Sequence, residues 1–409
     1  GLFSGRGAFL TVVPGRIILK GYEFLAAVAG KLSFCTWAGG RPQVCQMVGY
    51  YVILAVSVWI YRWTAQSGVD NDSFLKCESD LYNRKDSGKE MQIIQNSGVY
   101  KSHKRQNRCK YAVMKVWGIR GLCAAAVCLG ILLIGYKPRE DFRIACLDVG
   151  QGDGICIQTE QGHVWMMDGG SSTQKNLAKY CLEPYLKYWG IREVDGWMIS
   201  HFDQDHVSGL IEILEGYEKG WNQKNRNGIT VKRILIPDLM QEEDLEKQIL
   251  ELAEKLKIPV LRCKRLDKIK QDGMQIEVCS PIANFPYENQ NAGSMTVKVS
   301  YQDFSVLLTG DLEGEGEKQL LENDMGQIDV LKVAHHGSRN SSSEEILDTI
   351  GAKVAVISCG KGNRYGHPHR ELLDRLEKKG YQIRRTDLEG MIRFTLKKRK
   401  EDSDAGRRI

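Results

Sequence analysis

This sequence lacks the features that would identify its redox compartment or a nucleic-acid partner. Its twelve cysteines form no CxxC pair and no short-spaced Cys/His cluster. Cys123, Cys128, Cys146 and Cys156 lie inside apolar runs, where a thiol is more often a small core or lipid-facing side chain than a disulfide partner or zinc ligand. The formal net charge of +6 is too small to indicate nucleic-acid binding by itself.

The first residues lead us to expect that an N-terminal part is missing. It begins at Gly1 rather than Met, and its first residues lack the basic-then-apolar layout of a signal peptide. We therefore expect the chain to be part of a longer protein. Its 409 residues are enough for two or three domains, each with a core of its own.

Long apolar runs are confined to the first third of the chain. Residues 44–61 are 18 uncharged residues, about the minimum that spans a bilayer, and Arg62 and Trp63 follow as an interfacial cation and aromatic ring. Residues 121–136 are a run of 16, which reaches spanning length only if residues 116–120 are included and Arg120 snorkels. Each run could instead be a buried core helix. We interpret them as two transmembrane helices, because a soluble core would not need the segment between them.

That segment, residues 64–110, is polar throughout and is interpreted as a loop. Its end, KSHKRQNRCK, holds five Lys/Arg and no acid. Basic loops beside membrane spans tend to stay in the cytoplasm, so the second span would carry the chain back out. We expect a multi-pass protein of the cell membrane with its C-terminal domain extracytoplasmic. Residues 8–34 fit an interfacial helix or the remains of a larger membrane domain.

From Phe142 onward, short β-branched runs alternate with charged helical stretches. Many strands with helices between them predict a layered α/β domain over residues 138–397. The remaining residues, 398–409, are charged and are expected to be disordered.

The strongest functional signal is SHFDQDHVSGL, residues 200–210. It follows an apolar strand and precedes a helix, so His201, Asp203, Asp205 and His206 share one strand-to-helix loop. Four potential ligands in six residues suit two adjacent ions better than one tetrahedral ion. His201 and Asp203 would bind one ion, and Asp205 and His206 the other. A solvated polar turn is the alternative, and the density of acids and imidazoles argues against it.

Two further motifs follow apolar strands. Asp311, in LLTGDLEGEGE, places a carboxylate at a strand end, where it could bridge two cations or cap a helix beginning near Glu313. His335 and His336 follow the next strand, in LKVAHHGSRNSSS. Adjacent residues of an extended chain point to opposite sides, so only one of the two is expected to bind metal.

The remaining polar candidates carry weaker signals. Ser338 and the Ser341–Ser343 run could contact a phosphate or cap the helix after Ser343, and capping is the expectation for the run. In GKGNRYGHPHRE, His367 is expected to be functional and His369 to be a surface residue at a helix start. Asp168, in WMMDGGSS, could orient a metal ligand by hydrogen bonding or simply begin a turn.

Together these residues resemble the metallo-β-lactamase superfamily, which implies an αββα sandwich. HFDQDH is similar to its HxHxDH signature with Asp203 in place of the second His, and Asp168, Asp311 and the 335–336 pair match later motifs in order. The closer resemblance is to the ComEC family of DNA-uptake channel proteins. Its C-terminal domain is matched over residues 142–396 by LDVGQGD (147–153), DGG (168–170), TGD (309–311), HHGS, NRYGHPH (363–369) and RTDLEG (385–390). Residues 1–137 would then be the end of the membrane channel domain.

Two departures from the superfamily pattern bear on the metals. Asp203 offers an oxygen ligand, and no His lies between His206 and the TGD motif, where the superfamily usually has one. The resemblance implies two divalent ions. The oxygen ligand at position 203 favours Mn²⁺, with Zn²⁺ as the alternative, because oxygen-rich sites prefer harder ions.

By this resemblance the domain is a membrane-tethered metal-dependent phosphodiesterase. It would degrade the DNA strand that is not imported during natural transformation, in contact with the membrane and the DNA-uptake machinery. Asp205 would orient the attacking water, and His367 would hydrogen-bond the phosphate or protonate the leaving oxygen. Two alternatives stay open: hydrolysis of a lactone or thioester, and a non-catalytic channel module.

Overall fold

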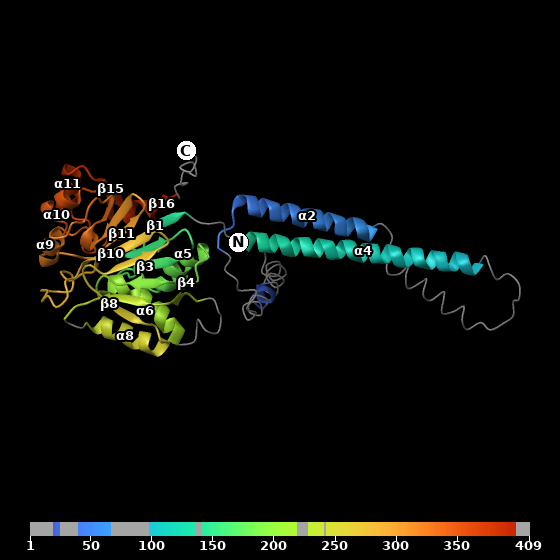
Figure 1. Ribbon diagram of the computed structural model, residues 1–409, viewed down its shortest axis with the longest axis horizontal. Coiled ribbons are helices and arrows are strands. Elements are labelled where there is room, and N and C mark those ends of the chain that lie inside the picture. The colour runs from blue at the N-terminus through green and yellow to red at the C-terminus, as the bar shows by residue number, and fades with distance from the viewer. Residues whose placement is uncertain are drawn as a thin grey trace, which may run out of the picture. The chain divides into compact units, whose positions relative to one another are not determined.

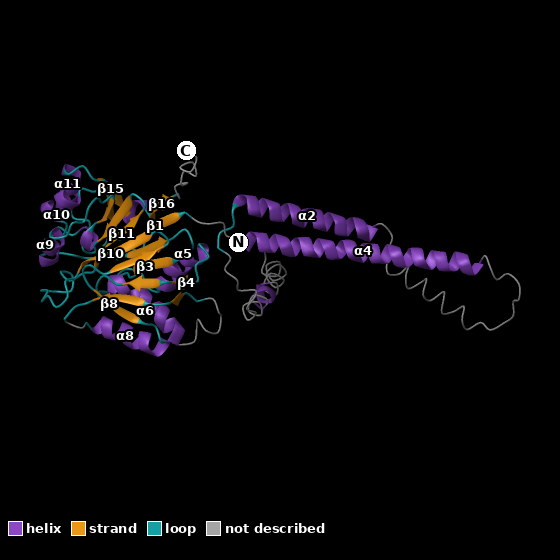
Figure 2. Cartoon of the chain, in the orientation of Figure 1, coloured by secondary structure: helices purple, strands orange, loops and turns teal. Residues whose placement is uncertain are grey.

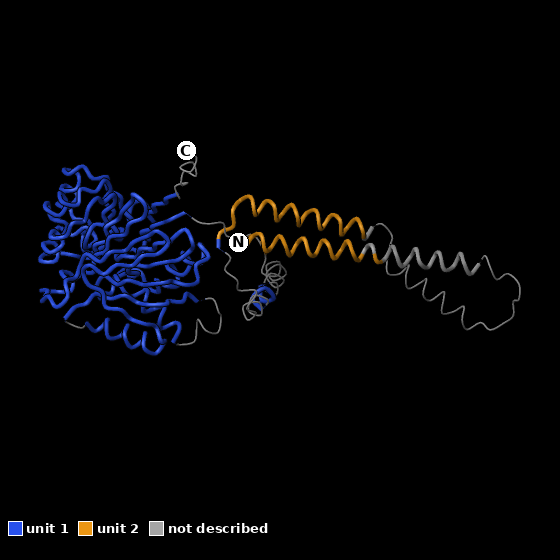
Figure 3. The backbone as a smooth tube through the Cα atoms, in the orientation of Figure 1, with its two compact units in different colours: residues 1–40, 139–409 blue, residues 41–138 orange. Residues whose placement is uncertain are grey.

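The computed structural model describes residues 19–24, 40–66, 98–135, 141–218, 228–240 and 243–397. They belong to two compact units, residues 41–138 and residues 1–40 with 139–409, which Figure 3 colours separately. Each unit is described by itself. The tail of residues 398–409, and most of residues 8–34, lie outside the described residues.

The first unit is a pair of helices packed side by side, α2 (Val44–Gln66) and α4 (Gly98–Gly135) (Figure 1). Val44–Thr64 and Trp117–Gly135 are long and apolar enough to cross a membrane, with mean hydropathies of 1.7 and 2.1. Their apolar side chains are largely exposed, which argues against the core-helix alternative. Two polar groups find partners in the pair: the Gln46 amide donates to the Leu133 carbonyl at 2.8 Å, and the Arg120 guanidinium lies 5.0 Å from the Tyr61 ring centroid.

The expected loop is shorter than predicted. Residues 98–110, which include the basic stretch KSHKRQNRCK, are the beginning of α4 rather than part of a loop. The stretch is free of Pro and Gly and rich in Lys and Arg, which are good helix formers, so the helix extends beyond the apolar run. Residues 67–97 lie outside the described residues.

The second unit contains two seven-stranded sheets (Figure 2). The order of the first sheet is β16 (Ile392–Leu396), β1 (Phe142–Cys146), β2 (Gly154–Gln158), β3 (Val164–Asp168), β5 (Gly196–Met198), β7 (Ile234–Pro237) and β8 (Val260–Cys263). The order of the second is β15 (Gln382–Arg385), β14 (Val354–Ile357), β13 (Val330–Lys332), β12 (Phe304–Leu308), β11 (Thr296–Tyr301), β10 (Met274–Ser280) and β9 (Lys268–Gln271). A short pair, β4 (Glu193–Val194) and β6 (Thr230–Val231), stands apart.

The helices cover the outer faces of the two sheets (Figure 1). The first sheet carries a π-helical turn (Ala178–Leu182), α5 (Glu183–Tyr188), α6 (Gln204–Glu218) and α8 (Asp244–Leu256). The second carries α9 (Glu315–Leu321), α10 (Glu344–Ile350) and α11 (Arg370–Lys378), and α12 (Thr386–Glu389) follows β15. The predicted αββα sandwich is confirmed.

Strand periodicity builds the three core layers of this sandwich. In β1, Phe142 and Ile144 face the second sheet and pack with Val297 and Val299, whereas Ala145 faces the helices of the first sheet. Because successive side chains alternate between faces, a strand buried on both sides reads as a continuous apolar run. This is why the central strands were predictable from the sequence.

Candidate metal centre

The HFDQDH motif follows β5 and continues into the start of α6. The helix begins earlier than expected, so Asp205 and His206 occupy its first turn, and His201 and Asp203 precede it. The turn after β3 packs tightly against this point: a Cβ on Gly170 would stand 2.3 Å from the backbone nitrogen of His206. A glycine is therefore required there for the DGG turn to approach the start of the helix.

Asp168 holds both the loop and the first histidine of the cluster. Its Oδ1 accepts the Ser200 backbone N–H, and its Oδ2 accepts the Ser200 hydroxyl, both at 2.8 Å. The same Oδ2 lies 3.0 Å from Nδ1 of His206. A carboxylate at Nδ1 fixes that nitrogen as the donor and leaves Nε2 to bind a cation.

The second sheet supplies Asp311, beyond β12, and His335 and His336, beyond β13. Both histidines have left-handed backbone, with φ of 51° and 52°, so the expectation that they alternate along an extended chain is wrong. Their Nε2 atoms lie 3.7 and 3.5 Å from Asp311 Oδ2. His336 is buried, with Nδ1 3.0 Å from the Ser358 carbonyl. The His335 side chain is 27% exposed and its Nδ1 lies 3.2 Å from the Glu313 carboxylate, which puts it at the rim.

Donor atoms from both sheets converge at His206 and His336. His206 Nε2 lies 3.2 Å from Asp311 Oδ1 and 3.3 Å from His336 Nε2. His336 Nε2 lies 3.5 Å from Asp205 Oδ2. Ligand atoms bonded at about 2.0–2.1 Å to one tetrahedral ion stand roughly 3.3 Å apart. These four side chains therefore fit a divalent cation.

Asp153 joins this cluster, although it was not among the expected site residues. It is buried, and one of its oxygens lies 3.5 Å from Nδ1 of His336. Ligand atoms of Asp153, His206, Asp311 and His336 all lie within 4.8 Å of one another. The other oxygen of Asp153 forms an ion pair with the buried ammonium of Lys332. The available signal was its place in LDVGQGD, a loop between two buried strands.

His201 and Asp203 are candidates for the first two ligands of a second metal ion. His201 is fully buried, its Nδ1 lies 3.0 Å from the Ser200 hydroxyl, and its Nε2 has no hydrogen-bond partner among the described residues. That Nε2 lies 3.5 Å from Asp203 Oδ2. The other oxygen of Asp203 accepts a hydrogen bond from the Gln290 side-chain amide at 2.5 Å. A buried, unpartnered imidazole nitrogen beside a carboxylate fits a cation ligand.

The electrostatics of the cluster favour positive charge. Burial lowers the pKa of His336, but the Asp311 and Asp153 carboxylates outweigh burial and raise this pKa to about 10. In the same way, Asp311 and Asp168 outweigh burial and raise the pKa of His206 well above its ordinary value. Burial alone would raise the pKa of Asp311, yet His336 and His206 hold it well below its usual range. A metal ion would take the place of these bound protons, so its binding should release protons.

His367 lies beside the cluster rather than inside it. Its ring centroid is 5.7 Å from that of His335 and 6.4 Å from that of His336. Burial, together with His336 and His335, lowers the pKa of His367 to about 4. The ring is therefore neutral at pH 7, which suits a hydrogen-bond donor.

Helix capping accounts for Ser343 but not for Asp311. Ser343 caps α10 by accepting the Ile346 N–H, as expected, and His369 stands at the start of α11. The Ser338 hydroxyl accepts the Asn340 N–H, and no described contact joins it to the metal cluster. The helix after the TGD motif begins beyond Gly314 without a side-chain cap, so capping does not explain Asp311.

Comparison with known proteins agrees with this architecture. Residues 147–221 and 267–361 match the family model described as the metallo-beta-lactamase superfamily. The globular domain is a metallo-β-lactamase domain. The metallo-beta-lactamase fold protein YhfI from Bacillus subtilis aligns over 62% of this chain and 100% of its own, with a TM-score of 0.41 and 13% identity.

Two curated relatives specify the family further. The chain is 32% identical to ComE operon protein 3 of Bacillus subtilis (strain 168), over 68% of this chain and 36% of that protein. It is 29% identical to Recombination protein 2 of Haemophilus influenzae (strain ATCC 51907 / DSM 11121 / KW20 / Rd), over 65% of this chain and 30% of that protein. The chain belongs to the ComEC family, and the match spans about a third of the length of these relatives.

Proposed function

We propose that the globular domain is a metal-dependent phosphodiesterase that degrades DNA, and that it acts on the strand not imported during DNA uptake. The observation that carries the hydrolase proposal is the convergence of His206, Asp311, His336 and Asp205, with donor separations of 3.2–3.5 Å. The Haemophilus influenzae relative supports the choice of DNA, since its name refers to recombination.

The side chains fit two divalent ions. His206, Asp311, His336 and Asp205 would hold one, and His201 with Asp203 would begin the other, with Asp311 between them. When bound, such ions supply a water of lowered pKa and neutralise charge on phosphoryl oxygens. Mn²⁺ is favoured over Zn²⁺ because Asp203, Asp205 and Asp311 make the donor set rich in oxygen.

The chain's own residues would bind and orient the reactants. Asp168 keeps Nε2 of His206 directed at the cluster by holding its Nδ1. Asp205, in the first turn of α6, would accept a hydrogen bond from the attacking water. His367 would donate a hydrogen bond to a phosphoryl oxygen as a neutral ring, which its lowered pKa favours over protonation of the leaving oxygen.

The test is hydrolysis by the full chain in detergent, with end-labelled single-stranded DNA, duplex DNA, a lactone and a thioester as substrates. Mn²⁺ or Zn²⁺ should support cleavage of DNA, and EDTA should abolish it. His206→Ala should lose the activity because it removes a ligand and opens the cluster. His163→Ala is the matched control, since His163 lies outside the cluster and pairs with Asp272. Cleavage of the lactone or thioester alone would replace the proposal, and full DNA cleavage by His206→Ala would refute it.

A further inference from the structure

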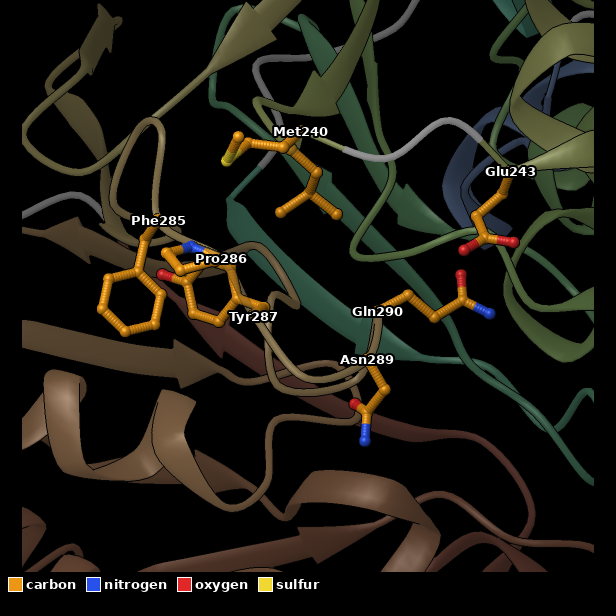
Figure 4. A pocket seen from close by; sticks show the side chains of 8 residues that line it. Met240, Glu243, Phe285, Pro286, Tyr287, Asn289 and Gln290 are labelled. Carbon is orange, nitrogen blue, oxygen red and sulfur yellow. The ribbon is translucent and has the colours of Figure 1, made fainter.

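A small pocket of about 230 Å³ adjoins the metal-binding loop (Figure 4). One wall is formed by Leu239 and Met240, after β7, with Glu243, before α8, and the other by Phe285, Tyr287 and Gln290, after β10. Its volume is below the roughly 300–1,000 Å³ of sites for drug-sized ligands, so it suits one flat ring system.

The pocket is connected to the metal cluster through Gln290. The oxygen of its side-chain amide accepts the Phe202 N–H at 3.1 Å, and the amide nitrogen donates to Asp203 at 2.5 Å. Both bonded residues belong to the HFDQDH motif. A group in this pocket would therefore be one side chain away from a proposed metal ligand.

The aromatic wall of the pocket is held in place. The Tyr287 hydroxyl donates to the Gln319 side chain at 2.6 Å and accepts the Ile282 N–H at 2.8 Å. The Phe285 ring stands 4.8 Å from that of Tyr287, centroid to centroid. Packing beside this wall is close, since a Cβ on Gly293 would stand 2.7 Å from a Leu239 methyl carbon and 3.3 Å from a Tyr287 ring carbon. Stacking on a fixed aromatic surface costs little entropy.

The opposite wall is apolar and acidic. Met240 is 65% exposed and faces the pocket across from Phe285 and Tyr287, as Figure 4 shows. Glu243 also lines the pocket. A carboxylate repels a phosphate but accepts hydrogen bonds from the amino groups of adenine or cytosine. The pocket is thus suited to the base of a nucleotide and unsuited to its phosphate.

We propose that this pocket binds one unpaired base of a single-stranded nucleic acid, next to the phosphodiester at the metal centre. The inference rests on the proposed function, which puts a phosphodiester at the metal centre. Stacking on aromatic side chains is tolerant of sequence and requires an unpaired base. The pocket would therefore select single strands over duplexes.

The test is binding of a fluorescein-labelled single-stranded oligonucleotide of deoxyadenosines to the full chain, measured by anisotropy in EDTA so that hydrolysis does not enter. The same strand with abasic sites and the same strand in a duplex are the comparison probes. The intact strand should bind roughly ten-fold more tightly than the abasic strand. Phe285→Ala and Met240→Ala should each reduce this preference.

Tyr180→Ala is the matched control, because Tyr180 is an exposed aromatic side chain, 67% accessible, that does not line the pocket. It should keep the full preference for the intact strand. Met240→Ala guards against a folding artefact, because that side chain is mostly exposed. Equal affinity for intact and abasic strands, or no binding of either, would overturn the base pocket. A base preference without cleavage of DNA would instead leave the pocket standing and refute the proposed nuclease.

Discussion

The Oδ2 atom of Asp168 lies 3.0 Å from Nδ1 of His206, at the point where the end of β3 meets the start of α6. This hydrogen bond joins a strand end to a proposed metal ligand, and it gives the DGG motif a role beyond its turn. Both side chains are fully buried, so no water competes for the bond.

Asp168→Asn should lower the affinity for Mn²⁺ or Zn²⁺ by about 10–100-fold, the usual effect of losing a carboxylate behind a histidine ligand. Asn is tolerated at the positive φ of this residue, which is 55°, so the fold should survive. Isothermal titration calorimetry on the full chain measures the change. Asp374→Asn, at an exposed position on α11, is the control. An unchanged affinity would leave Asp168 with a purely structural role.

Asp203→His should shift the preference of the site from Mn²⁺ toward Zn²⁺, because an imidazole is a softer ligand than a carboxylate. The side chain lies 3.5 Å from Nε2 of His201, so a histidine there would still reach the same ion. The ratio of the two metals bound under competition, measured by mass spectrometry of the metals, decides the point. If this ratio does not change, Asp203 is not a ligand.

The ion pair between Lys332 and Asp153 is almost fully buried, and removing one partner should be costly. Lys332→Met would leave the Asp153 carboxylate without its cation, and breaking a buried pair in this way costs about 3–5 kcal/mol in the free energy of unfolding. Denaturant unfolding followed by tryptophan fluorescence provides the measurement.

Two comparisons make the Lys332 experiment specific. Lys353→Met removes a lysine whose side chain is 78% exposed, so it should cost less than about 1 kcal/mol. Adding Asp153→Asn to Lys332→Met should recover part of the loss, because the unpaired charge is then gone. Equal effects of the two lysine substitutions would contradict the buried pair.

The predicted membrane orientation can be tested by cysteine labelling of intact cells. We expect Cys77, kept as the only cysteine, to be protected from an impermeant thiol reagent. Native Cys359 cannot report on the globular domain because it is fully buried, so Tyr180→Cys is the better probe there. This position should be labelled without lysis. Labelling of Cys77 in intact cells, with Tyr180→Cys labelled only after lysis, would invert the orientation and remove the geometry that DNA uptake needs.

The central strands and the strand-end motifs were predictable because their signals are local. Asp311 and the HFDQDH motif each follow an apolar strand, and strand ends gather polar side chains at one edge of a sheet. The short strands β8, β9 and β15 carry no such signal, because Arg262, Lys270 and Arg384 interrupt their apolar patterns.

Three other features of the site could not be predicted from the sequence, because they exist only in the folded chain. The left-handed backbone at His335 and His336 falls on two residues that are not glycine, so the residue types do not indicate it. Gln290 and Asp203 are 87 residues apart, so their hydrogen bond exists only in the folded chain. The same holds for the ion pair of Asp153, because its partner Lys332 is 179 residues away.

The first strand of the domain, β1, pairs with the last strand to be synthesised, β16. Phe142 in the first strand of the domain is in register with Leu396 in the last. A ribosome that has just made Phe142 must therefore add about 250 more residues before that strand gains its outer neighbour, a delay of at least ~10 s at 5–20 residues per second. Until then β1 presents an unpaired edge, which is prone to association with other chains. Nascent chains of this domain are thus expected to need protection by a chaperone for as long as their C-terminus is incomplete.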